Sequence, residues 1–132
     1  MKKYLIVGLG NIGQEYTNTR HNIGFEILDS FAAKVNISFS NVKFGSVSEY
    51  KFKGRSFIFL KPNTYMNLSG SAVTHWLKSE KIPLTNLLII SDDLNLPFAK
   101  LRLKPSGSNG GHNGLRDIES SLNTNEYNRL RV

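Results

Sequence analysis

The chain of 132 residues contains no cysteine, few prolines and no long run of apolar residues. Without cysteine it can form neither a disulfide nor a thiolate zinc site, which fits a reducing compartment. Its three histidines are scattered and match no metal-ligand spacing. No stretch could span a bilayer, and the apolar run after Met1-Lys2-Lys3 is too short for a signal peptide. We therefore expect a soluble, cytoplasmic protein that holds no metal.

Acidic residues are also few. There are 10 of them against 17 lysines and arginines, which gives a formal net charge of +7. This charge on one domain favours an anionic partner, and nucleic acid is the most common one. A basic protein with no such partner is the alternative that charge alone leaves open.

The apolar pattern predicts strands that alternate with helices. Residues 3–8 are apolar on both faces, as in a buried parallel strand, and a helix capped by Asn22 follows them. Two strands, residues 42–52 and 55–60, are joined at Lys53-Gly54, a two-residue hairpin turn. The later elements are a helix after residue 67, a buried strand at 87–90, a half-buried strand at 100–103, a helix capped by Asn113 and a strand that begins at residue 127. We therefore expect a single α/β domain over residues 1–132, with one antiparallel hairpin in its sheet.

A glycine pattern directly after the first strand offers one functional interpretation. Gly8, Gly10 and Gly13 match GxGxxG, the fingerprint of dinucleotide-binding folds and of a nucleotide-dependent oxidoreductase. In those folds the third glycine lies in a helix, so apolar residues should recur three and four positions apart. Residues 14–21 are polar and lack this period. We expect the glycines to shape a loop that presents side chains instead.

Polar residues follow several predicted strands where each strand ends. In open α/β sheets, ligands bind beyond the carboxyl ends of the parallel strands, so these residues are the candidates for a site. They are Asn11 and His21 after the first strand, Tyr65 and Asn67 after the hairpin, Asp92 and Asp93 after the third, and His112 and Asn113 at the last helix.

These residue types can activate a water molecule and hold a polar substrate such as an ester. A neutral imidazole accepts a proton from water, and a carboxylate on its other nitrogen fixes the tautomer and stabilises the imidazolium. Carboxamides offer a donor and an acceptor without repelling an anionic substrate. The chain has no serine in a nucleophile elbow and no cysteine, which favours direct attack by water over a covalent intermediate.

Simpler interpretations exist for several of these residues. Asn67 and Asn113 both precede amphipathic helices, so helix capping alone explains them. Chemistry does not rank Asp92 against Asp93, because neighbours at a strand end point to opposite sides. His112 is a rival base or a structural contact.

Two further sets of residues have simple explanations. We expect His75 to be a surface residue within the second helix. A solvated face would explain Lys100, Arg102 and Lys104, which alternate on one strand.

Five motifs are spread along the whole chain. They are VGLGN-x-G-x-x-Y-x-x-TRHN-x-G at residues 7–24, KP-x-T-x-MN-x-SG at 61–70, DDLNLP at 92–97, GGHNGL-x-DI at 110–118 and RLR at 129–131. In these motifs and in their order the chain resembles the bacterial peptidyl-tRNA hydrolase family, which cleaves peptides from prematurely released peptidyl-tRNA.

The resemblance implies roles for individual residues. His21 would activate water, Asp92 would stabilise its basic form, and Asn67 and Asn113 would bind the water and the ester end of the substrate. Asn11 would sense a blocked amino nitrogen. The remaining implied contacts are Tyr16 and Tyr65 in the groove for the 3′ end and the peptide, and Lys104 with Arg131 at the tRNA 5′-phosphate.

The resemblance also implies a monomer with helices on both faces of a mixed, mostly parallel sheet and with no metal or organic cofactor. Relatives continue past the RLR motif, so this chain is expected to be incomplete at its C-terminus, with an exposed sheet edge, low stability and weak activity. A second functional class is a non-catalytic RNA-binding relative, similar to splicing factors that keep the fold. The complete set of His21, Asp92 and asparagines argues against it.

Overall fold

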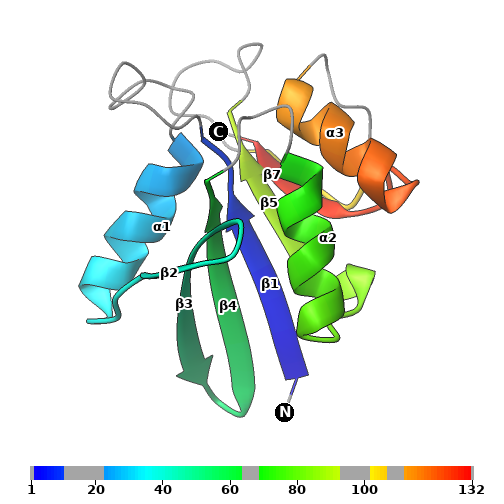
Figure 1. Ribbon diagram of the computed structural model, residues 1–132. Coiled ribbons are helices and arrows are strands. Elements are labelled where there is room, and N and C mark those ends of the chain that lie inside the picture. The colour runs from blue at the N-terminus through cyan, green and yellow to red at the C-terminus, as the bar shows by residue number, and fades with distance from the viewer. Residues whose placement is uncertain (1, 11–22, 64–68, 93–101, 107–111, 132) are drawn as a thin grey trace.

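The computed structural model describes residues 2–10, 23–63, 69–92, 102–106 and 112–131. These residues form one seven-stranded sheet with three α-helices packed against it (Figure 1). In chain order the elements are β1 (Lys2–Gly8), α1 (Ile23–Lys34), β2 (Ser40–Val42), β3 (Gly45–Phe52), β4 (Arg55–Pro62), α2 (Ser69–Ser79), the 3-10 helix η4 (Leu84–Asn86), β5 (Leu87–Ser91), β6 (Arg102–Lys104), α3 (Asn113–Leu122) and β7 (Asn128–Arg131).

The sheet has the strand order β2-β3-β4-β1-β5-β7-β6. Strand β1 pairs in parallel with β4 and with β5, and β5 pairs in parallel with β7. The other pairs, β2 with β3, β3 with β4 and β6 with β7, are antiparallel. The carboxyl ends of β1, β4, β5 and β7 therefore lie at one edge of the sheet, which we call the carboxyl edge. The predicted α/β architecture and the β3–β4 hairpin are confirmed.

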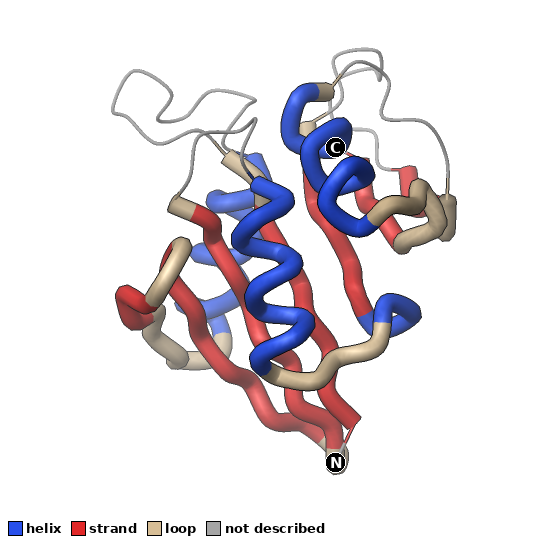
Figure 2. The backbone as a smooth tube through the Cα atoms, turned by 45° about the vertical axis from the view of Figure 1, so that its right-hand side comes forward, coloured by secondary structure: helices blue, strands red, loops and turns tan. Residues whose placement is uncertain are grey.

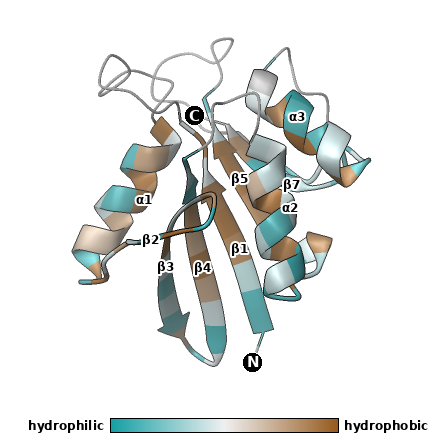
Figure 3. Cartoon of the chain, in the orientation of Figure 1, coloured by the Kyte–Doolittle hydropathy of each residue, from teal (hydrophilic) through white to brown (hydrophobic). Residues whose placement is uncertain are grey.

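Alternating residues of the central strands supply the two apolar layers. Leu5 and Val7 of β1 face a core that includes residues of α2 and α3, such as Val73 and Ile118. Ile6 points to the other face, where α1 covers the sheet. Figure 3 shows the hydrophobic colour concentrated on the central strands, and Figure 2 shows α1 crossing the face opposite to the other helices. Helices on both faces were expected, and the structure confirms them.

Lys53 and Gly54 form the hairpin turn with positive φ angles of 50° and 76°. A two-residue turn of this kind needs positive φ at both positions, which only the glycine adopts without strain. The turn was predicted from this glycine, and the structure confirms it.

The prediction of one strand over residues 42–52 is wrong. The chain turns at Lys43 and Phe44, so that β2 folds back on β3, and Phe44 has a φ of 70°. A bulky residue rarely adopts this conformation. Contacts from distant segments stabilise it here, because the Phe44 ring packs edge-on against His75 at 5.2 Å and its carbonyl accepts a hydrogen bond from the Asn63 N–H at 2.9 Å.

The expectations at the end of the chain also need correction. Leu103 in β6 is 68% exposed and belongs to neither apolar cluster, so the half-buried interpretation of this strand is wrong. The reason is that β6 is the edge strand. Strand β7 was expected to leave an exposed edge, yet it lies between β5 and β6 and pairs with both. In the part of the chain that is described, no helix is long and apolar enough to cross a membrane.

A matched pair of glycine substitutions tests the close approach of α1 to β1. A Cβ at Gly24 would lie 2.5 Å from the backbone N and O of Leu9, whereas a Cβ at Gly54 would have no atom within 4 Å. Alanine is the better helix former by ~1 kcal/mol, so a local effect alone would make Gly24→Ala stabilising. We expect it instead to lower the free energy of unfolding by about 2–3 kcal/mol, through steric overlap. Gly54→Ala should cost only ~1 kcal/mol, the strain of its positive φ. Urea unfolding of both variants measures this, and a smaller loss for Gly24→Ala would contradict the tight contact.

Candidate functional site

The described residues on either side of residues 11–22 lie at the carboxyl edge. After β1, the N–H of Leu9 donates to the carbonyl of Ile90 at 2.9 Å, which holds this part of the chain beside the end of β5. After residue 22, α1 begins against β1, where a Cβ on Gly8 would lie 2.4 Å from the carbonyl oxygen of Gly24. Asn11, Tyr16 and His21 belong to residues 11–22, between these two points, and lie outside the described residues, as does the predicted cap Asn22.

Asp92 stands at the centre of the carboxyl edge, directly after β5. The residue is 5% exposed. Its Oδ1 lies 2.7 Å from Nε2 of His112, which precedes α3. Burying a carboxylate costs free energy unless hydrogen bonds compensate it, so this contact stabilises the charged group in place. The structure thus joins two predicted site residues that are far apart in the sequence. Asp93, the competing carboxylate, lies outside the described residues.

The second nitrogen of His112 faces the start of α3. Nδ1 accepts hydrogen bonds from the backbone N–H groups of Gly114 at 3.0 Å and Leu115 at 3.2 Å. A ring nitrogen that accepts these bonds needs its lone pair, so the ring proton belongs on Nε2, where it is donated to Asp92. The two sets of contacts therefore agree on one tautomer of His112.

His112 is consequently the N-cap of α3, and the prediction that Asn113 caps this helix is wrong. His112 has the extended backbone of a cap residue, with φ of −71° and ψ of 121°, while Asn113 is already the first helical residue. Asparagine is the commoner cap, but the imidazole reaches two of the unpaired N–H groups in the first turn. Because its lone pair is used by the helix, the structural role of His112 is favoured over that of a rival base.

The remaining predicted residues are placed only in part. Tyr65 and Asn67 belong to residues 64–68, outside the described structure. Asn113 and Arg131 have a described backbone, in α3 and β7, and their side chains lie outside it. Lys104 is exposed on β6.

The strand register relates Lys104 to Arg131. Lys104 pairs with Arg129 and Arg102 pairs with Arg131, so the predicted phosphate contacts lie on neighbouring strands, two residues apart in register. The structure therefore brings these two positions near each other along the sheet.

Arg129 has a structural role that the sequence did not suggest. It is fully buried, and its guanidinium lies 4.0 Å from the centre of the Tyr127 ring. It also donates to the carbonyl of Asn125 and lies 3.6 Å from a carboxylate oxygen of Glu119 in α3. Arginine tolerates burial where stacking and hydrogen bonds replace water. The RLR motif gave no signal that separates this buried cation from an exposed one.

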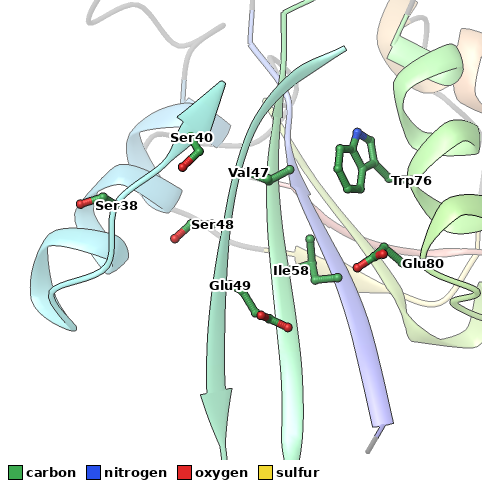
Figure 4. Close-up of a pocket in the computed structure, with 8 residues that line it drawn as sticks. All are labelled: Ser38, Ser40, Val47, Ser48, Glu49, Ile58, Trp76 and Glu80. Carbon is green, nitrogen blue, oxygen red and sulfur yellow. The ribbon is translucent and has the colours of Figure 1, made fainter. Parts of the chain in front are cut away.

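A pocket elsewhere on the surface contains none of the predicted site residues. Figure 4 shows it beside β3 and β4, with Trp76 and Glu80 reaching toward it from the end of α2. The side chains that line it are Ser38, Ser40, Val47, Ser48, Glu49, Ile58, Trp76 and Glu80. Two carboxylates at its wall repel phosphate groups, so this pocket does not suit nucleic acid. His75, expected at the surface, is half-buried, and its ring packs against Phe44 and Trp76.

A parallel sheet edge that carries a buried carboxylate paired with an imidazole is the kind of site found in α/β enzymes. The sequence model of the peptidyl-tRNA hydrolase family matches residues 5–132. The chain therefore belongs to the peptidyl-tRNA hydrolase family.

Individual relatives agree with this assignment. The peptidyl-tRNA hydrolase of Phocaeicola vulgatus is 57% identical over 129 residues, which cover 98% of this chain and 69% of the relative. The peptidyl-tRNA hydrolase of Bacteroides fragilis is 58% identical over 129 residues, which again cover 98% of this chain and 69% of the relative. The crystal structure of peptidyl-tRNA hydrolase from Acinetobacter baumannii superposes with a TM-score of 0.91 at 40% identity, and covers 98% of this chain. The match spans 66% of that solved chain, slightly less than two thirds of its length.

Substitution of His112 tests its two contacts separately. His112→Ala removes the helix cap and a hydrogen bond to a buried carboxylate, and should lower the free energy of unfolding by about 2–4 kcal/mol. His112→Asn supplies a short cap side chain and should recover ~1 kcal/mol of that loss. Urea unfolding of both variants measures the difference. Equal stability of His112→Ala and the unchanged protein would show that neither contact stabilises the fold.

Proposed function

We propose that this protein hydrolyses the ester bond that joins a peptide, or an N-blocked amino acid, to the 3′-terminal ribose of tRNA. The observation that carries the proposal is the family match over residues 5–132, with the family's motifs in order. The buried Asp92 at the carboxyl edge supports it, because an enzyme site in such a sheet is expected at this edge.

In the proposed mechanism, His21 is the general base. It takes a proton from water, whose oxygen attacks the ester carbonyl carbon, and Asp92 stabilises the imidazolium that forms. The tetrahedral intermediate then breaks its bond to the ribose oxygen, which receives the proton, so the products are a free carboxylic acid and tRNA with a 3′-hydroxyl. Asn67 and Asn113 bind the water and the ester end.

Other residues are proposed to recognise the substrate. Asn11 senses the blocked amino nitrogen, and Tyr16 and Tyr65 line the groove for the 3′ CCA end and the peptide. Lys104 and Arg131 bind the 5′-phosphate region of tRNA. The +7 net charge supports an anionic substrate of this size. We propose further that the enzyme is a cytoplasmic monomer.

Replacement of the general base tests the reaction. His21→Ala should lower the rate of amino-acid release from N-acetylated aminoacyl-tRNA on the order of 10²–10⁴-fold, because the proton acceptor is lost, while tRNA binding persists. His75→Ala is the matched control, since it removes an imidazole from α2. Free aminoacyl-tRNA should be a poor substrate for the unchanged protein. Full turnover by His21→Ala would refute the mechanism, and tRNA binding without cleavage by the unchanged protein would indicate a non-catalytic RNA-binding relative.

The phosphate contact is tested by the salt dependence of binding. Lys104→Ala should weaken tRNA binding and reduce the slope of log K against log salt by roughly one charge, with less effect on a minimal 3′-end ester. Lys51→Ala removes the same charge from an exposed position on the β3–β4 hairpin and serves as the control. Equal losses for the two variants on tRNA would mean that Lys104 acts only through the overall charge.

A further inference from the structure

Three aromatic residues form a row across neighbouring strands near one end of the sheet. Phe57 of β4 pairs in register with Tyr4 of β1 and with Tyr50 of β3, so the three side chains lie on one face. The rings of Tyr4 and Phe57 stack with their centres 5.2 Å apart. Phe31 of α1 packs edge-on against Tyr50 at 5.4 Å, which places the row on the face that α1 covers.

The next row along the same face is exposed and carries two cations. Arg55 of β4 pairs in register with Lys2 of β1 and with Phe52 of β3. All three side chains are exposed, and Phe52 is 50% exposed although it is a large apolar residue. Figure 1 shows the start of β1 and the β3–β4 turn extending beyond the ends of α1 and α2. This row therefore lies past the part of the sheet that these two helices cover.

A third cation lies beside the exposed ring. Lys53 belongs to the turn between β3 and β4, and its Nζ lies 5.3 Å from the centre of the Phe52 ring. The Tyr50 ring is nearly parallel to that of Phe52, with planes 13° apart and centres separated by 5.9 Å. Parallel rings at this separation are offset, so part of the Phe52 ring stays uncovered. We call the two rows together with Lys53 the aromatic-basic face.

The charges on this face are of one sign. Its cations are Lys2, Lys53 and Arg55, and none of its other residues is acidic. The acidic residue of these three strands is Glu49, which pairs with Ile58 and so belongs to the opposite face of the sheet. The aromatic-basic face therefore attracts anions, whereas the pocket beside Glu49 repels phosphate.

Aromatic rings and cations on an open sheet face suit an unpaired strand of nucleic acid. Its bases stack on aromatic side chains, and lysine and arginine bind the phosphates between the bases. Packing between strands would by itself explain the row of three rings. It does not explain a half-exposed phenylalanine among three cations, whereas a partner that combines flat apolar groups with negative charge does.

We propose that the aromatic-basic face binds an unpaired strand of RNA, with a base stacked on Phe52 and phosphates paired with Lys53 and Arg55. This is a second RNA site, apart from the carboxyl edge. Lys2 and Gly8 stand at opposite ends of the seven-residue strand β1, about 20 Å apart at the usual rise of a strand. The choice of RNA over DNA rests on the proposed function, whereas the binding of a single strand rests on the face itself.

Fluorescence anisotropy with a labelled oligoadenylate RNA of about eight nucleotides tests the proposal. Phe52→Ala should weaken binding roughly tenfold, because a stack between base and ring is lost, and Phe52→Tyr should restore it. Leu103→Ala removes another exposed large apolar side chain, in β6, and should leave the affinity unchanged. Urea unfolding establishes that each variant is folded under the conditions of the assay.

The charge contribution is tested on the same hairpin. Lys53→Gln should lower the slope of log K against log salt by about 0.7, the share of one phosphate contact on a single strand. Lys51→Gln removes the same charge from the opposite face, where Lys51 pairs with Ser56, and should lower the slope less. In ¹⁵N-labelled protein, the amide signals of Lys53 and Gly54 should shift as the RNA is added.

Several results would overturn the second site. They are an unchanged affinity in Phe52→Ala, equally tight binding of polyphosphate, which has no bases, tighter binding of a DNA strand of the same sequence, or displacement of the RNA by a minimal 3′-end ester. Binding of phosphatidylserine vesicles without binding of RNA would assign the face to a membrane instead. These assays need no turnover, so a protein that cleaves no ester would refute the proposed function while RNA binding still decides this proposal.

Discussion

The hydrogen bonds of one imidazole connect the end of β5 to helix α3. His112 donates to the buried carboxylate at the end of β5 and accepts from the first turn of α3, so neither element can shift without breaking a contact of the other. At the opposite side of the same edge, α1 meets β1 through Gly8 and Gly24, where backbone touches backbone. The carboxyl edge is therefore built from contacts that tolerate little displacement, which is what a site with several converging side chains requires.

The sequence predicts the fold best where local pattern and burial agree. Apolar residues on both faces marked β1 and β5, and Gly54 marked the hairpin turn, because each signal depends on residues that are close together in the chain. The break at Phe44 depends on His75 and Asn63, which are remote in the sequence, so no local pattern contains it. The place of β7 between β5 and β6 and the exposure of Leu103 are likewise results of strand order.

The candidate site is predictable to a similar extent. Topology brings Asp92 and His112 to one edge of the sheet. Asp92 follows β5, which ends there, and His112 precedes α3, which begins there. Their hydrogen bond depends on side-chain geometry, which the amino-acid sequence does not specify. The usual preferences for helix N-caps favoured Asn113 over His112. The sequence also does not tell which basic residues are exposed and which are buried. Lys104 is exposed, whereas Arg129 is buried against Tyr127 and Glu119, and these tertiary contacts distinguish the two cations.

The order of the strands in space has a consequence for synthesis on the ribosome. Strand β6 is the edge strand, and its pairing within the described residues is with β7, which is made more than twenty residues later. A chain that has emerged only as far as α3 can assemble β1, β4 and β5, since these pair with one another. Its β6 must wait without a sheet partner. Among the described strands, the side of the sheet that carries Lys104 is therefore completed last. A ribosome that pauses before residue 128 holds a nascent chain in which β1, β4 and β5 can pair before β6 has its partner.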